Sequence, residues 1–456
     1  MTISSSGSYS TGNIVENLTL SDSFYVSSDV AWAVENIIAD TALIFSNDKD
    51  VNVGTMTLTG NSELSLGTAD INVSVTNLVT VNNTQIIRNG GGSLNFIGGI
   101  MLAEGSELIG QGQQISGNID LNGGKLTTEQ GTAIPDNMTL TADSTVQIDA
   151  SQTLTYGGPV VDIGGSKLKI QGGGSFINSS FSALSLNNAD SHLVLDNVSV
   201  GSVSASVDDS LGVVVENDST ISNFAVSNIT PVSIASGKTL EGSIGITAGS
   251  LKLTETGTLA SAVSMSGGTT LDADNSLTVS GALTQSGDIT IDIAGESTLT
   301  YLGPSISLGP NTLILSGGGT FTNTNPLELD QGQSQLNLSG IIASYIRTKS
   351  NNLGITVDNS STVTEFSVGH VTPVSISPNQ SFNGFINVYQ NSNLQLNNTG
   401  TLAADVTISG LGGTVEAQKS MTFSGSLQQV DQHEGFELII ASGETMTYSG
   451  SEFDIG

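Results

Sequence analysis

The feature that most constrains the fold of this chain is a long internal repeat. The segment Thr153-Leu-Thr-Tyr156-Gly-Gly-Pro159 returns as Thr298-Leu-Thr-Tyr301-Leu-Gly-Pro304, and again as Thr445-Met-Thr-Tyr448-Ser-Gly450. The three tyrosines are 145 and 147 residues apart (301 − 156 and 448 − 301). Tandem duplication at this scale usually builds an extended scaffold of stacked units rather than one closed globule.

The residues that the copies share indicate that the repeat preserves a fold rather than a reactive site. Residues 219–234 and 361–376 are identical at nine of sixteen positions. Across the copies, apolar residues, Gly and Pro are kept, and most changes fall on polar residues. The expected organisation is an N-terminal cap with the first coils at 1–50, diverged coils at 51–152, copy 1 at 153–297, copy 2 at 298–443 and the truncated start of a third copy at 444–456.

Short runs with period-two alternation predict β-strands throughout the chain. Examples are Ser62-Glu-Leu-Ser-Leu66 and Ser166-Lys-Leu-Lys-Ile170, and Gly, Asn and Ser clusters separate such runs. Apolar residues also recur at the length of a solenoid coil, as at Leu126, Val146 and Leu168 (20 and 22 apart), Leu251 and Leu271 (20 apart), and Leu394 and Val415 (21 apart).

We therefore predict an all-β chain that forms a parallel β-helix with about 20–22 residues per coil. Ladders of small and β-branched side chains suit such stacking, and glycines suit its corners. A tandem array of β-sandwich domains is the alternative, although no linker marks a domain boundary. The best helical candidate is Asp29–Asn36, which includes Trp32, the only tryptophan, and which we expect to cap the first open edge.

The composition excludes several classes of function. Ten Lys and Arg residues face 42 Asp and Glu residues, so the formal net charge is −32 and nucleic acid is a poor partner. Only 11% of residues are charged, where roughly 25% is usual, so hydroxyls and amides must supply the polar surface. The absence of cysteine excludes disulfides and thiolate chemistry, and no apolar run is long enough to span a bilayer as a helix.

The start of the chain has no basic segment followed by an apolar one, as a secretion signal would have. We expect a mature piece or a fragment of a longer protein; a complete cytoplasmic protein is the alternative.

Segments such as Asn311-Thr-Leu-Ile-Leu-Ser-Gly-Gly-Gly-Thr-Phe-Thr-Asn323 resemble the repeats of bacterial autotransporter passengers and filamentous adhesins. The resemblance covers most of the chain and lies in the style of its Gly-, Ser-, Thr- and Asn-rich repeats. It implies a right-handed β-helix that is exported to the cell surface. The translocation barrel of an autotransporter is absent from these 456 residues, which leaves the export route open.

The residues that carry chemistry form no recognisable catalytic set. The three histidines, His192, His370 and His433, are isolated, and each is expected to be a surface residue. Only Arg88 and Arg347 are arginines, and neither has an acidic cluster adjacent in sequence. The densest carboxylate groups are Asp48-Lys-Asp50, Asp208-Asp209 and Asp272-Ala-Asp274, and we expect the last pair to align with Val415 and Ala417 of copy 2.

We therefore predict no catalytic or cofactor-binding residue, and an enzyme stays the minority alternative. Weakly bound Ca²⁺ at a turn is the only cofactor that the carboxylates suggest, and its ligands remain open.

Two recurring motifs have structural interpretations. Gly-Gly-Gly at 90–92, 172–174 and 317–319 lacks the Lys and Ser/Thr of a phosphate loop, and we interpret it as a coil corner. Tyr156, Tyr301 and Tyr448 could stack on sugars, but we favour one packing role repeated in each copy.

These observations lead to three functional hypotheses. The first is a non-enzymatic extracellular protein of the bacterial cell surface, a rigid stalk or adhesin that binds a glycan or protein on a host or neighbouring cell. The second is a self-assembling filament or surface-layer subunit that associates end to end. The third is a polysaccharide-degrading β-helix of the tailspike type.

Overall fold

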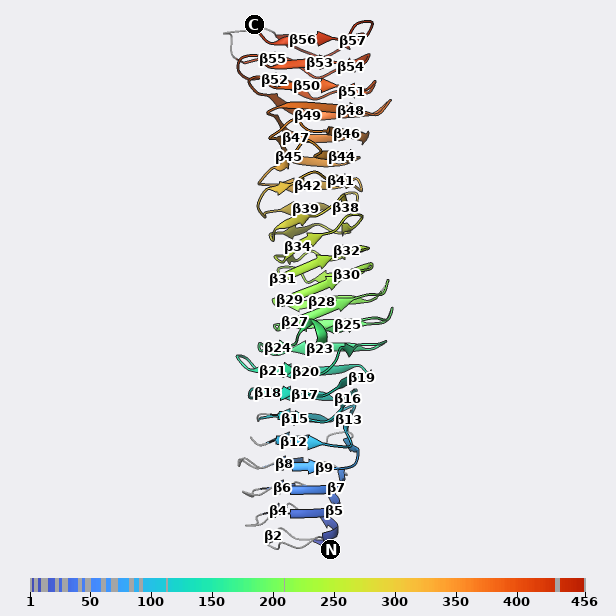
Figure 1. Ribbon diagram of the computed structural model, residues 1–456, viewed down its shortest axis with the longest axis vertical. Helices are drawn as coiled ribbons and strands as arrows, with labels where there is room; N and C mark the ends of the chain where they lie inside the picture. The colour runs from blue at the N-terminus through green and yellow to red at the C-terminus, as the bar shows by residue number, and fades with distance from the viewer. Residues whose placement is uncertain are drawn as a thin grey trace. The chain divides into compact units, whose positions relative to one another are not determined.

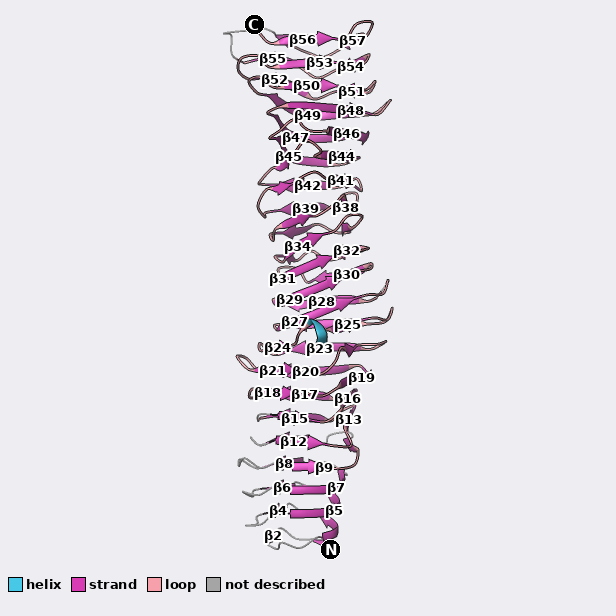
Figure 2. Ribbon diagram, viewed as in Figure 1, coloured by secondary structure: helices cyan, strands magenta, loops and turns pink. Residues whose placement is uncertain are grey.

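The computed structural model describes residues 2–3, 7–9, 15–20, 24–26, 32–39, 43–45, 51–58, 63–66, 73–81, 86–89, 93–111, 114–208, 210–430 and 435–454. Nearly all of its regular structure is β-strand, with one short 3-10 helix, η1 (Ser180–Ser182), drawn in cyan in Figure 2. The chain divides into two compact units: residues 1–225 with 240–242, and residues 226–239 with 243–456. The division falls within copy 1, not at a repeat boundary.

In the first unit, strands of successive coils pair in parallel. Strand β23 (Lys167–Gln171) lies between β20 (Ser144–Ile148) and β26 (His192–Asp196), and both pairings are parallel. Figure 1 shows β20 and β23 in successive rows. Parallel neighbours joined by a whole coil are the defining pattern of a β-solenoid and are absent from an antiparallel β-sandwich. The predicted parallel β-helix is therefore confirmed.

The second unit repeats this arrangement. Strands β32 (Ser250–Leu253), β35 (Thr270–Ala273), β38 (Ile289–Ile293) and β41 (Thr312–Ser316) form a parallel series. Their inward positions hold Leu251, Leu271, Ile291 and Leu315, all buried. Removing each such side chain from water contributes roughly 1.5–3 kcal/mol, so the stacked apolar ladder is the main source of stability.

Coil length varies more than the sequence spacing predicts. Leu108 pairs with Leu126 after 18 residues (126 − 108), whereas Ile170 pairs with Leu195 after 25 (195 − 170). The expected pairs Leu126–Val146, Leu251–Leu271 and Leu394–Val415 are all present. The expected step from Val146 to Leu168 is wrong, because Val146 faces Ile170. Extra residues at a corner lengthen that coil without disturbing the ladder.

The helix expected at Asp29–Asn36 is also wrong from Trp32 onward, because β5 (Trp32–Ala39) is a strand paired in parallel with β3 (Val15–Leu20) and β7 (Val51–Leu58). Residues 29–31 lie outside the described residues. The buried residues Val34 and Ile37 of β5 are three positions apart, because two consecutive residues between them, Glu35 and Asn36, are not buried. A spacing of three imitates the helical period.

The repeated Tyr motif has a common structural role in copies 1 and 2. Tyr156 and Tyr301 are both buried, and each hydroxyl accepts a hydrogen bond from the backbone N–H of the preceding coil, of Met138 and of Leu283 respectively, at 3.2 Å. Each ring stacks on a phenylalanine of the next coil, Phe176 or Phe321, with ring centroids 6.2 Å apart.

The glycine two positions after each tyrosine completes this motif. A Cβ atom at Gly158 or Gly303 would meet both the tyrosine hydroxyl and a backbone oxygen of the coil before, of Asp136 or Gly281. The conserved Tyr-x-Gly spacing therefore follows from packing.

Candidate functional site

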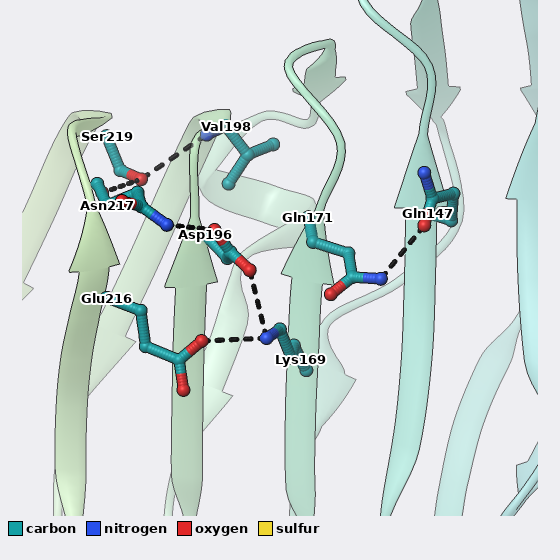
Figure 3. A network of polar contacts seen from close by, with 8 residues as sticks. All are labelled: Gln147, Lys169, Gln171, Asp196, Val198, Glu216, Asn217 and Ser219. Atoms are coloured by element: carbon teal, nitrogen blue, oxygen red, sulfur yellow. Dashed lines mark hydrogen bonds and ion pairs between the residues drawn. The ribbon is translucent and has the colours of Figure 1, made fainter.

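The first candidate site is a charged cluster on the outer face of the first unit (Figure 3). Lys169 on β23 places its Nζ 3.0 Å from Asp196 Oδ2 on β26 and 2.7 Å from Glu216 Oε2 on β28 (Gly212–Asn217). The hydrogen bond to Glu216 raises the pKa of Lys169, partial desolvation lowers it, and Asp196 raises it further. Lys169 thus forms ion pairs with carboxylates on the next two coils and links the three coils together.

Amide side chains extend this cluster along the coils, as Figure 3 shows. Gln171 Nε2 donates to Gln147 Oε1 at 2.9 Å, and Asn217 Nδ2 donates to Asp196 Oδ1 at 2.7 Å. Ser219 Oγ accepts from the N–H of Val198 at 3.3 Å. Such ladders satisfy polar groups where the coil turns.

A second charged cluster lies in the other unit. Glu328 on β43 (Leu327–Leu329) is only 6% exposed, and it binds both Arg347 on β45 (Ile342–Thr348) and Lys349. The distance from Lys349 Nζ to Glu328 Oε2 is 2.6 Å. The hydrogen bond to Glu328 is the main cause of the raised pKa of Arg347.

Sequence reasoning missed this cluster because it sought acidic neighbours of Arg347 along the chain. Glu328 and Arg347 are 19 residues apart and lie opposite each other in the ladder. Searching one coil length upstream of each cation would have found the pair.

The predicted carboxylate pair Asp272 and Asp274 lies beside a lysine. Its expected alignment with Val415 and Ala417 is wrong, because the ladder places Glu416 of copy 2 at the position of Asp272. Lys252 Nζ is 3.2 Å from Asp274 Oδ2 and 4.0 Å from Asp272 Oδ2. Desolvation raises the pKa of Asp272, and the charges of Asp274 and of Asp292 on the next coil add to this effect. Within the part of the chain that the structure describes, no three His, Cys, Asp or Glu residues form a group suited to a metal ion.

The structure does not gather the predicted histidines or arginines into one site. His192 begins β26 and is half-buried, and desolvation, followed by the charge of Lys167, lowers its pKa. His370 is exposed, as expected. Arg88 lies on β11 (Ile86–Asn89). His433, Asp48, Asp50, Asp209 and the glycines at 90–92 lie outside the described residues.

The other two glycine triplets are coil corners, as predicted. Gly172, Gly173, Gly317 and Gly318 have positive φ angles between 85° and 115°. The burial of Tyr156 and Tyr301 supports their packing role and leaves neither ring available to a sugar. Tyr448, by contrast, is half-buried.

Shallow hollows open on the outer surface of the described residues in both units. The first unit has one of about 270 Å³ near Glu35 and Asn52. A larger hollow in the first unit, of about 410 Å³, lies over β24 (Ser175–Ile177), β27 (Ser199–Ala205) and β29 (Ser219–Val226). The hollow in the second unit is smaller, about 170 Å³, and lies over β31 (Thr239–Ile246), β34 (Ala262–Met265) and β37 (Leu283–Gln285). Ser, Thr, Asn and Gln supply the polar lining of the hollows over β24 and β31.

No protein-family model, curated protein or solved structure matches the chain. Among the described residues, no helix has the length and apolar character needed to cross a bilayer.

Proposed function

We propose that the chain is a non-enzymatic extracellular protein of a bacterial cell surface, which serves as a rigid β-solenoid stalk or adhesin. The observation that carries this proposal is the parallel ladder that continues through the coils of each unit. Strand β38, for example, pairs on one side with β35 and on the other with β41. Backbone hydrogen bonds thus run along the stacking direction, which resists bending and local opening.

The ion pairs between successive coils also support a structural role. Lys169, Lys252 and Glu328 each join residues of different coils, so their charges stabilise the stacking. A net charge of −32 favours solubility and attraction of cations, which suits a protein exposed to a salty exterior.

The location is tested by labelling intact cells of the natural source with antibodies against the purified chain. Surface labelling that is lost after mild protease treatment is expected. Labelling only after permeabilisation would contradict an extracellular role.

The structural role is tested by negative-stain electron microscopy over a range of concentrations, with and without Ca²⁺. Separate elongated particles are expected at every concentration. Filaments that lengthen with concentration would favour the self-assembling alternative. Release of reducing ends from a polysaccharide panel would contradict the non-enzymatic assignment.

A further inference from the structure

The most exposed large apolar side chain of the described residues belongs to a short insertion in copy 1. Phe181, on η1, is 86% exposed. Phe176 and Leu186 are ten positions apart, whereas their counterparts in copy 2, Phe321 and Leu329, are eight apart (186 − 176 and 329 − 321). Copy 1 therefore carries two extra residues at this corner.

The coil does not need this insertion to close. In copy 1, Asn178 Nδ2 donates to the carbonyls of Ser182 and Ser202, and Asn178 Oδ1 accepts from the N–H of Ser202 at 2.7 Å. In copy 2, Asn323 makes the same set of bonds to Asn325 and Tyr345. Since the asparagine clasp forms without an exposed aromatic ring, packing does not account for Phe181.

The insertion borders the larger hollow of the first unit. Asn178 lines that hollow, and its amide holds the carbonyl of Ser182 at the end of η1. Ile177 and Val160 near the same corner are 51% and 46% exposed. Their counterparts in copy 2 are the polar Thr322 and Ser305. The apolar rim is thus specific to copy 1.

The lining of the hollow is polar but uncharged. It consists of Ser175, Phe176, Ile177, Asn178, Ser199, Gly201, Ser202, Ser222 and Asn223. Although the chain has a net charge of −32, this hollow has no ionisable side chain, so it offers neither a carboxylate to pair with a cationic ligand nor a basic group to pair with an anionic one. Hydroxyl and amide groups beside an exposed aromatic ring match a neutral ligand that has both hydroxyl groups and an apolar face.

We infer that the hollow over β24, β27 and β29, together with the adjoining η1 insertion that carries Phe181, is a binding site for a neutral carbohydrate. The ring of Phe181 packs against the C–H face of one sugar, and the exposed Ser222 and Asn223 hydrogen-bond its hydroxyls. This inference rests on the adhesin form of the proposed function, to which it adds a ligand class and a location.

The experiment screens the purified full chain against an array of neutral hexose- and N-acetylhexosamine-terminated oligosaccharides. The strongest ligand is then titrated by calorimetry against wild type, Phe181→Ala, Phe181→Trp and Ser202→Tyr. The last variant places in copy 1 the residue that copy 2 has at Tyr345. The control is Phe385→Ala, which removes an exposed ring from β49 (Ser381–Val388) in the other unit.

We expect Phe181→Ala to weaken binding by roughly tenfold or more, because it removes the aromatic anchor. Ser202→Tyr should weaken binding to a similar extent, because the larger side chain fills part of the hollow. Phe181→Trp and Phe385→Ala should bind like wild type. Unfolding curves check that every variant is folded. If Ser202→Tyr does not fold, Phe181→Ala alone decides the inference.

Two outcomes overturn the inference: no oligosaccharide binds, or Phe181→Ala binds as tightly as wild type. A cell-adhesion assay with beads coated with the chain distinguishes failure of the carbohydrate site from failure of the proposed adhesin function. Beads that adhere to cells without any carbohydrate binding would leave an adhesin with a protein partner and overturn the carbohydrate site alone.

Discussion

Copy 1 and copy 2 share one coil framework but place their charges on different faces. The first copy has the Lys169–Asp196–Glu216 cluster, at positions where copy 2 has Ile314, Ser339 and Asp358. The second has the Glu328–Arg347–Lys349 cluster, where copy 1 has Ser185, Ser204 and Ser206. The charged clusters are therefore additions to the framework and not part of it.

The corner beside the first cluster shows what the framework itself requires. Asn217 donates to Asp196 in copy 1, and Asn359 donates to Ser339 in copy 2, both at 2.7 Å. The asparagine is kept while its acceptor changes, because the turn needs an amide donor and either acceptor satisfies it. Duplication has thus preserved packing and hydrogen bonding and left outward side chains free to diverge.

The largest expected effect tests whether both copies need a glycine where successive coils stack most closely. Gly242 and Gly384 have φ angles of 117° and 115°, and a Cβ at either would collide with a backbone oxygen of the preceding coil, of Ile221 or Val363. We expect Gly242→Ala and Gly384→Ala each to lower the free energy of unfolding by about 3 kcal/mol or more.

The measurement is urea unfolding followed by circular dichroism. Gly268→Ala is the control, because Gly268 also has a positive φ, 80°, but a Cβ there meets no atom within 4 Å. Its loss should be about 1 kcal/mol, from backbone strain alone. Equal losses for Gly268 and Gly384 would show that close stacking is not the constraint.

The next prediction concerns the paired tyrosines. Tyr156→Phe and Tyr301→Phe each leave a buried backbone N–H, of Met138 or Leu283, without its hydroxyl acceptor. Each should cost about 1–2 kcal/mol in unfolding free energy, since an unsatisfied buried donor loses its solvation. Tyr448→Phe, at a half-buried ring, should cost less. A loss in only one of the two copies would show that the tyrosines are not equivalent.

Removing the central carboxylate of the copy 2 cluster should lower the free energy of unfolding moderately, whereas a substitution at the matching position of copy 1 should not. Glu328→Gln removes the carboxylate that Arg347 and Lys349 share. Because both cations are partly exposed, we expect a loss of about 1 kcal/mol after screening. Ser185→Ala, at the matching position of copy 1, should change stability by less than about 0.5 kcal/mol. Thermal unfolding of the two variants at low and high salt measures the difference, which should shrink at high salt.

The smallest expected effect is the pH dependence that Asp405 adds in copy 2. Asp405 accepts hydrogen bonds at 2.8 Å from the N–H and the hydroxyl of Ser426, which lower its pKa below the ordinary 3.8. Copy 1 has Ala262 and Ala282 at these positions. A depressed pKa adds stability above pH 3.8, and this contribution is lost as the pH falls through the folded-state pKa.

The wild type should therefore exceed Asp405→Asn in stability by less than about 1 kcal/mol near neutral pH, because Asp405 is exposed. The two unfolding curves should converge below pH 3.8. A difference that stayed constant down to pH 2 would rule out the carboxylate as its source.

Much of the fold follows from the sequence because a solenoid is encoded locally. The alternation within Ser166–Ile170 predicts a strand with one buried side, and β23 is that strand. The spacing of Leu251 and Leu271 predicts their stacking, because a coil of constant length brings equivalent residues together. Alternation is interrupted in β5, where two consecutive residues that are not buried give the buried ones a helical spacing, so the sequence predicted a helix there.

The candidate site was much less accessible to sequence reasoning. Phe181 and the polar hollow involve residues of three coils, from Ser175 to Asn223. Their proximity depends on the lengths of the coils between them, such as the 24 residues from Ser175 to Ser199, which insertions at the corners set one coil at a time. One misjudged coil shifts every outward neighbour that follows.

By itself, the sequence determined that this chain is a tandemly duplicated, acidic, cysteine-free β-solenoid, because repeat length, alternation and charge are properties of the chain in order. Only the tertiary structure decided which outward side chains meet. Lys169 and Glu216 are 47 residues apart and still bind each other. The reason is physical: the inward face is specified by a period of two, but the outward face depends on the length of every coil between two residues.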